Sequence, residues 1–320
     1  MKLNHQMKFI AVVLLLATAH LANAATPAPA AQKAVAQKTF ATPQEAASAL
    51  AEAVRKHDKN LLQAVLGPSS RSWLSSGDEV ADRRDMDKFL AAYDRKNSIS
   101  QQTDGKAILL AGEGGWSFPA PMVRKGNGWV FDAVAGHEEI FNRRIGRNEL
   151  DAIQTLLAVV DAQREYAAGD PDRNGYHDYA RRFISGKGKK DGLFWPSRAG
   201  EPLSPLGPLV GAAAREGYGK KSGGGKSSGK AAAYHGYRYR ILAAQGKHAP
   251  GGAYSYLVGD KMIGGFAMVA YPAKYGVSGV MTFLVNHDGI VHQKDLGKST
   301  GADAQGLRSF SPDPSWTKVQ

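Results

Sequence analysis

The feature that most constrains the fold is a change in the spacing of apolar residues, which happens twice along the chain. Up to Tyr93 they recur every three or four positions, as on one face of a helix. From Ala107 they fall in strand-like runs separated by glycine turns. A second long helix is expected from Asn148 to Gly169, and strand-like runs return from Tyr237. The pattern predicts an α+β fold with helices packed on antiparallel sheets.

Three helices are expected before the first strands. Thr42 stands before Pro43, with Glu45 three positions further on, which is the capping-box pattern of a helix start. Asp58 is expected to cap a second helix, which Gly67 ends. The third helix carries its apolar face on Val80, Met86, Phe89, Leu90 and Tyr93. Strands are expected at residues 108–110, 116–122 and 129–134.

Residues 40–137 are expected to form the first of two domains. Their order of elements, helices and then a meander, resembles the cystatin-like or nuclear-transport-factor-like fold. Folds of this kind serve both enzymes and binding modules, so the resemblance does not choose a function.

Residues 138–320 are expected to form the second domain, with a flexible basic loop at 219–231. Residues 137–139 are interpreted as a surface turn between the domains. The helix that follows is expected to bury Leu150, Ile153, Leu157 and Val160.

The amino terminus has the three parts of a signal peptide. Lys2 and Lys8 precede an apolar run at residues 9–17, and Ala22 and Ala24 provide the small residues at a cleavage site. The run is shorter than the roughly 20 residues that span a bilayer. We therefore expect residues 1–24 to be removed, residues 25–39 to form a flexible spacer, and the mature chain to be periplasmic or secreted without a transmembrane helix.

Composition excludes several classes of site. The chain has no cysteine, so disulfides, thiolate metal sites and a cysteine nucleophile are excluded. The formal net charge is +12, of which +10 remains after removal of Lys2 and Lys8. A basic excess attracts anionic surfaces at low salt, although it also serves simple solubility.

One loop has the spacing of a weak calcium site. Oxygen-bearing side chains at Asp170, Asp172, Asn174 and Asp178 take positions 1, 3, 5 and 9 of an EF-hand loop, and the carbonyl of Tyr176 takes position 7. Position 12, where the loop normally carries a glutamate, is an arginine. The sequence therefore predicts calcium as a possible cofactor, with an ordinary Asx-rich turn as the alternative.

A basic surface is the second candidate site. Arg143, Arg144, Arg147, Arg238 and Arg240 belong to a stretch rich in arginine, lysine and tyrosine. Such residues hold polyanions through phosphate contacts and base stacking, and a solvated basic face is the alternative.

Enzymatic motifs are incomplete. The segment Gly225, Lys226, Ser227 does not have the spacing of a phosphate loop, so no nucleotide cofactor is expected. His235, His287 and His292 lie near expected strand ends and could meet Asp288 or Asp295, but no Gly-x-Ser-x-Gly elbow is present. A hydrolase would have to use carboxylates and histidines from the domain junction.

Three strings carry a family resemblance: NRRIGRNEL at 142–150, DAQREY at 161–166 and YGVSGVMTF at 275–283. They resemble the bacterial domain-of-unknown-function family 2950, which implies an exported protein without an assigned activity or catalytic residues. The carboxyl-terminal half also resembles type IV pilin and pseudopilin heads, on Asn148, Gln163 and Tyr166 and the Asp288-Gly289 turn. Charged residues at 143–149 replace the apolar half-helix of a pilin, so filament formation is not expected.

These observations favour a non-enzymatic exported protein that binds or assembles in the envelope. Its expected partner is an unknown envelope protein or an anionic polymer. The alternatives that remain open are a polyanion-binding protein and a hydrolase at the domain junction.

Overall fold

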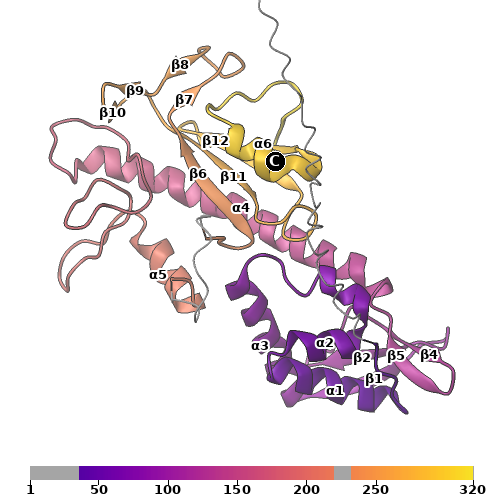
Figure 1. The fold of residues 1–320 in the computed structure, drawn as a ribbon. Coiled ribbons are helices and arrows are strands. Elements are labelled where there is room, and N and C mark those ends of the chain that lie inside the picture. Colours follow the sequence, from indigo (N-terminus) through magenta and orange to yellow (C-terminus); the bar gives the residue numbers. More distant parts are fainter. Residues whose placement is uncertain (1–35, 220–231, 320) are drawn as a thin grey trace, which may run out of the picture. The chain divides into compact units, whose positions relative to one another are not determined.

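The computed structural model describes residues 36–219 and 232–319, in which helices and strands follow each other in two runs (Figure 1). The helices of the first run are α1 (Pro43–Arg55), α2 (Lys59–Leu66), the 3-10 helix η1 (Pro68–Ser72) and α3 (Glu79–Arg95). Its strands are β1 (Asn97–Gln101), β2 (Ala107–Ala111), β3 (Trp116–Ser117), β4 (Met122–Lys125) and β5 (Gly128–Phe131). The fold is of the α+β class that the sequence predicts.

The first helices start where their capping residues predict. The Thr42 hydroxyl accepts the N–H of Glu45 at 3.1 Å, and the Glu45 carboxylate accepts the N–H of Ala41 at 3.2 Å. Asp58 accepts the first backbone N–H groups of α2. Each such cap contributes about 1 kcal/mol to helix stability.

The first sheet is antiparallel, with the strand order β1-β2-β4-β5 and β3 paired to β2. Helices α1 and α2 contact β5, and α3 contacts β1 and β2. Along β2 the side chains of Ala107, Leu109 and Ala111 are buried, and the two between them are half-buried, as expected where one face of a strand meets helices. The helices and this sheet enclose the first hydrophobic core.

One helix, α4 (Ala135–Gly169), connects the two runs and contributes to two cores. Its first turns place Ile140 and Phe141 against the first core. Its later turns bury Ala152, Leu156 and Val160 in the second core. The second run therefore shares a continuous helix with the first.

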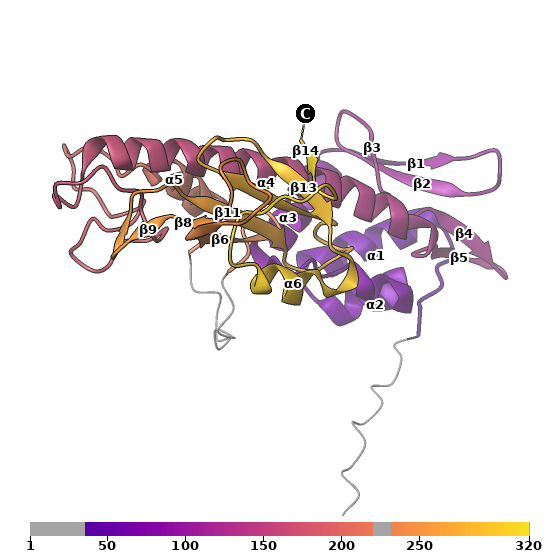
Figure 2. The ribbon, with the colours of Figure 1, turned by 90° about the horizontal axis from the view of Figure 1, so that it is seen from above.

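The second run contains α5 (Gly207–Glu216) and an antiparallel sheet of order β14-β13-β12-β11-β6. The strands of this sheet are β6 (Tyr237–Leu242), β11 (Ala267–Pro272), β12 (Met281–Asn286), β13 (His292–Asp295) and β14 (Thr317–Lys318). Two short hairpins pair β7 (Ala244–Gln245) with β8 (Tyr254–Ser255) and β9 (Leu257–Val258) with β10 (Lys261–Met262). Helix α4 packs on β11 and β12, and α6 (Thr300–Gly306), preceded by the 3-10 helix η2 (Gly297–Ser299), packs on β11 (Figure 2).

Aromatic and basic side chains alternate along β6. Tyr237 is buried against Phe283, with ring centroids 5.7 Å apart. Arg240 donates hydrogen bonds to the carbonyl oxygens of Ala304 and Leu307 at the carboxyl end of α6. A cation at this end of a helix is favourable, because the last carbonyl groups have no partner within the helix.

The expected start of the long helix at Asn148 is wrong, because α4 already begins at Ala135. Residues 137–139 are helical and not a turn between domains. Asp132 accepts the N–H groups of residues 134 and 135 and so provides the start signal. Asn148 is instead only 3% exposed, and its amide donates to the carbonyl oxygen of Ser278 at 2.9 Å.

The predicted core stripe of this helix is also partly wrong. Leu150 is 66% exposed, whereas the neighbouring Ala152 and Leu156 are fully buried. The expected strand at 116–122 is broken into β3 and β4, because prolines at 119 and 121 cannot donate to a strand ladder.

The folded region begins before Phe40, within the predicted spacer. The Gln37 amide donates to the carbonyl oxygens of Leu66 and Phe131 at 3.0 and 2.8 Å, and the Lys38 N–H donates to a carbonyl of α2. The signal peptide predicted at 1–24 and residues 25–35 of the spacer lie outside the described residues, as does the basic loop from 220 to 231. In the part of the chain that the structure describes, none of the helices has both the length and the apolar character needed to cross a membrane.

Candidate functional site

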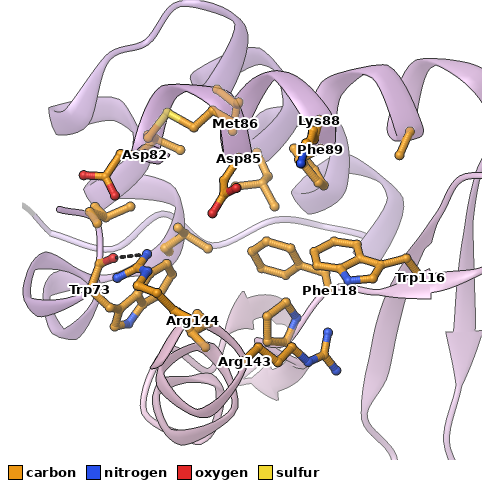
Figure 3. Close-up of a pocket in the computed structure, with 18 of the residues that line it drawn as sticks. Trp73, Asp82, Asp85, Met86, Lys88, Phe89, Trp116, Phe118, Arg143 and Arg144 are labelled. Atoms are coloured by element: carbon orange, nitrogen blue, oxygen red, sulfur yellow. Dashed lines mark hydrogen bonds between the residues drawn. The ribbon is translucent and has the colours of Figure 1, made fainter. Parts of the chain in front are cut away.

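A cavity of about 400 Å³ lies in the first core, between α3, the amino-terminal part of α4 and residues 116–119 (Figure 3). Its deep part is lined by Leu50 of α1 and by Leu62 and Leu66 of α2, each at most 2% exposed. Small-molecule ligands occupy cavities of this size, which are mostly apolar with a few placed polar groups. The lining has this composition, so the cavity is the candidate binding site.

Aromatic side chains form one wall of the cavity. Phe89 of α3 packs against Trp116 and Phe118, with ring centroids 6.3 and 5.7 Å apart. Trp116 is 43% exposed and therefore reaches the mouth of the cavity. The Phe118 N–H donates to the carbonyl oxygen of Leu109 in β2 at 2.8 Å, which holds Phe118 beside the sheet just before the prolines at 119 and 121 interrupt the strand ladder.

Arg144 and Trp73 form a polar end of the cavity. The Arg144 Nη2 donates to the backbone carbonyl of Trp73 at 3.0 Å (Figure 3). The Arg144 Nη1 and the Trp73 indole Nε1 are buried, and neither has a hydrogen-bond acceptor among the described residues. Burial lowers the pKa of the Arg144 guanidinium from its usual value. A buried donor left unpaired costs about 1–3 kcal/mol, so two of them at one cavity call for an explanation.

Two carboxylates near this end already have partners. Both Asp82 oxygens accept the backbone N–H of Ser76, at 3.2 and 3.0 Å, and burial raises the pKa of Asp82. Asp85 forms an ion pair with Arg147 at 2.7 Å. Within the described residues, no carboxylate lies within ion-pair distance of Arg144.

The mouth of the cavity is basic. Arg143 pairs with Glu139 at 2.6 Å and lies over the Trp116 ring. Lys88 also lines the cavity, so its lining as a whole carries four cationic side chains and two carboxylates, a net formal charge of +2. The site therefore combines an apolar interior with a positive electrostatic potential.

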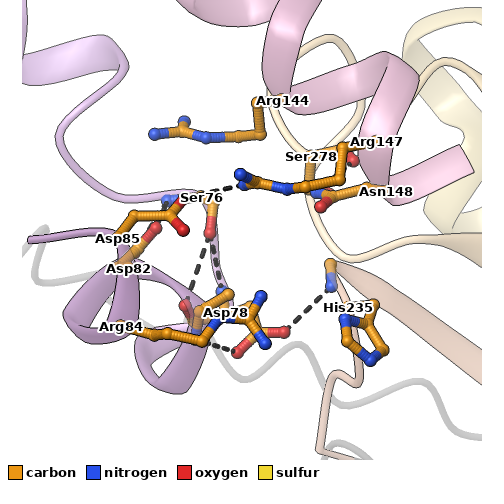
Figure 4. A network of polar contacts seen from close by, with 12 residues as sticks. Ser76, Asp78, Asp82, Arg84, Asp85, Arg144, Arg147, Asn148, His235 and Ser278 are labelled. Atoms are coloured by element: carbon orange, nitrogen blue, oxygen red, sulfur yellow. Dashed lines mark hydrogen bonds and ion pairs between the residues drawn. The ribbon is translucent and has the colours of Figure 1, made fainter. Parts of the chain in front are cut away.

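A polar network fixes α3 to the segments before the second sheet (Figure 4). Asp78, only 3% exposed, caps α3 by accepting the Ala81 N–H at 3.0 Å. Its other oxygen accepts the Tyr218 hydroxyl at 2.8 Å and the Gly236 N–H at 2.9 Å. A single carboxylate thus holds three separate parts of the chain, one of which, α3, forms a wall of the cavity.

His235 lies between carboxylates beside this network. Its Nδ1 is 3.3 Å from Asp151 of α4, and its Nε2 is 3.7 Å from Glu216 of α5, which also pairs with Arg84 of α3. We call these four residues the His235 cluster. Burial lowers the pKa of His235, against the opposing effect of Asp151 and Glu216. Of the histidine–carboxylate pairs expected from the sequence, His287 lies 3.8 Å from Asp288, whereas His235 has Asp151 and Glu216 as neighbours. The use of either histidine in hydrolysis stays a prediction.

The predicted calcium residues lie in one loop after α4. The Asp170 carboxylate accepts two backbone N–H groups of this loop. The Asn174 amide nitrogen donates to Asp172 at 2.8 Å and to Asp178 at 3.0 Å, while the Asn174 oxygen accepts the Tyr176 N–H. Asn174 therefore presents donors, not an oxygen ligand, to these carboxylates. Nowhere in residues 36–219 and 232–319 do three or more His, Asp or Glu side chains form a group that could hold a metal ion, and calcium binding stays a prediction.

The five predicted polyanion-binding arginines have different surroundings. Arg143, Arg144 and Arg147 line the cavity. Arg238 and Arg240 belong to β6, where both are half-buried and donate to backbone carbonyl oxygens. A polyanion site that uses all five stays a prediction.

Sequence reasoning missed the cavity because most of its lining residues are apolar residues of an ordinary core pattern. The signal that was available is the combination of three arginines at 143, 144 and 147 with an aromatic segment at 116–118 that prolines interrupt.

A family model described as Protein of unknown function (DUF2950) matches residues 37–319. No curated protein and no solved structure matches the chain.

Proposed function

The chain belongs to this family of unknown function, whose description assigns no activity, and we propose that it binds an apolar or amphipathic small molecule in the cavity between α3 and α4. The observation that carries the proposal is the cavity itself, a space of about 400 Å³ whose floor is made of leucine side chains. Small molecules bind in concave, mostly apolar pockets of roughly 300–1,000 Å³, and this pocket is open to solvent at Trp116, so a ligand can enter it.

The residues of the lining favour binding over catalysis. The ionisable groups around the cavity are arginine, lysine and aspartate. Among the described lining residues there is no serine, threonine, tyrosine or histidine that would act as a nucleophile or neutral base. Each methylene transferred from water to this interior contributes about 0.8 kcal/mol, so affinity is expected to come mainly from the apolar body of the ligand.

Binding is tested with N-phenyl-1-naphthylamine, a neutral apolar fluorophore whose emission rises when it leaves water. We expect a saturable rise with the native protein. Leu74→Trp places a larger side chain in the cavity and should abolish the rise. Leu209→Trp is the matched control, because this half-buried leucine packs against the second core and should leave probe binding intact. Equal probe binding by the two variants would place the probe elsewhere and refute the proposal.

We also propose that the protein works outside the cytoplasm after cleavage behind Ala24, as the leader at 1–24 predicts. Amino-terminal sequencing of protein from the cell envelope tests this, and a native chain that starts at Met1 would contradict it. A cystatin-like first part and a pilin-head-like second part are also proposals. The first rests on the order of helices and strands, and the second rests on short motifs. We also propose a partner in the cell envelope, either a protein or an anionic polymer, because the chain carries a basic net charge that attracts anionic surfaces.

A further inference from the structure

The residues that line the cavity have hydrogen-bond donors that lack an acceptor. Two buried donors, Arg144 Nη1 and Trp73 Nε1, have no acceptor among the described residues. The two carboxylates of the cavity lining have other partners, because Asp82 accepts the Ser76 N–H and Asp85 forms an ion pair with Arg147. A ligand that completes this end must therefore bring acceptors and not donors.

The charge of the site also favours an anionic ligand. Four cationic and two anionic side chains line the cavity, which leaves a net formal charge of +2. Arg144 has no ion pair with a described carboxylate, and its burial lowers its pKa because the charged form is poorly solvated. An anion at this position would compensate the buried charge. Arg147 pairs with Asp85 and Arg143 pairs with Glu139, which leaves Arg144 and Lys88 against Asp82, so a single negative charge fits best.

We infer that the ligand is a long-chain carboxylate, whose head group accepts hydrogen bonds from Arg144 and Trp73 and whose hydrocarbon chain lies on the leucine floor. This inference rests on the proposed function and names the chemical class of its ligand. Both residues line the cavity, while their unpaired nitrogens have almost no exposed surface. Binding therefore requires the Arg144 guanidinium to turn toward the head group. A planar guanidinium offers parallel N–H groups that suit the two oxygens of a carboxylate.

The test compares decanoate with decan-1-ol, which share the same chain and differ in the head group. Each displaces N-phenyl-1-naphthylamine from the native protein at pH 7.5, and the dissociation constants are compared. We expect decanoate to bind at least about 10-fold more tightly, the effect of one charge-assisted hydrogen bond. Arg144→Gln should remove this preference and leave decan-1-ol binding unchanged. Arg164→Gln, an exposed arginine of the same helix outside the cavity, should keep the preference.

Three results separate the inference from the proposed function. Equal affinity for the two compounds in the native protein refutes the carboxylate head group and leaves the apolar binding site standing. A preference for decanoate that persists in Arg144→Gln refutes the role of this arginine. Failure of the native protein to bind the fluorophore refutes the proposed function, and the inference with it.

A second variant keeps the test valid if Arg144→Gln does not fold. Trp73→Phe retains the aromatic packing and removes only the indole N–H. We expect it to weaken decanoate binding about threefold to tenfold, as loss of a single hydrogen bond predicts, and to leave decan-1-ol binding unchanged. Equal weakening of both compounds would show a packing effect and count against the inference.

Discussion

Replacing Asp78 by alanine should be among the most destabilising single substitutions in the chain. The carboxylate is almost fully buried and accepts hydrogen bonds from Ala81, Tyr218 and Gly236. Loss of the helix cap costs about 1 kcal/mol. The buried Gly236 N–H and the half-buried Tyr218 hydroxyl lose their acceptor, at about 1–3 kcal/mol each. The expected loss is therefore about 5 kcal/mol, a large fraction of the stability of a typical domain.

Urea unfolding followed by circular dichroism measures this loss. Asp58→Ala is the matched control, because Asp58 caps α2 in the same way but is exposed, and among the described residues its carboxylate accepts hydrogen bonds only from the neighbouring Asn60 and Leu61. It should lose only about 1 kcal/mol. A double-mutant cycle with Tyr218→Phe should give a coupling energy of about 1–3 kcal/mol with Asp78. If Asp78→Ala loses no more stability than Asp58→Ala, the network does not connect the segments energetically, and the reasoning fails.

Three further predictions concern pH, packing and calcium. Burial lowers the pKa of His235 below its unfolded value, so the unfolded state binds more protons as the pH falls through about 6.5, and the free energy of unfolding should decrease in acid. His235→Gln should make the urea midpoint depend less on pH between 7.5 and 5.5. An unchanged pH dependence would contradict this. Gly136→Ala should lower the melting temperature, because the new methyl group would lie 2.7 Å from Ala120. Gly146→Ala has open space around the new methyl group and should raise the free energy of unfolding by about 0.5–1 kcal/mol. A Gly136→Ala variant more stable than Gly146→Ala would contradict the packing of α4. Calcium should raise the melting temperature and Asp178→Asn should remove the rise, while identical curves with calcium and with chelator would rule out a stabilising site.

The parts of the fold that depend on local signals were predictable. Thr42 and Asp58 are followed by the helices they cap, and Gly67 ends the second one, because capping involves only neighbouring backbone groups. The α+β class also follows from the change in apolar spacing. These features need no knowledge of distant contacts.

The start of α4 was not predictable in the same way. Asp132, whose carboxylate accepts the N–H groups of residues 134 and 135, directly follows the apolar run of β5 and looks like the end of a strand. Asn148, which has the composition of a helix start, is instead buried by its contact with Ser278, a residue far away in the sequence. Tertiary contacts decide which of two equivalent local signals is used.

The candidate site was predictable only in part. The sequence singles out Arg143, Arg144 and Arg147, but as part of a polyanion site or of a solvated basic face and not as the lining of a cavity. What distinguishes Arg144 is its burial next to Trp73, which is a property of packing between α3, α4 and η1. The leucines of the floor have the same pattern as any core residue, so the cavity between them has no separate signature in the sequence.

Helix α4 has a consequence for how this chain can be divided. At 1.5 Å per residue its 35 residues extend about 50 Å, and each half of it supplies apolar side chains to a different core. A fragment that stops within it would expose a hydrophobic stripe to water, and so would a fragment that begins there. Neither half is expected to be expressed, transplanted or exchanged by recombination without carrying the whole helix along.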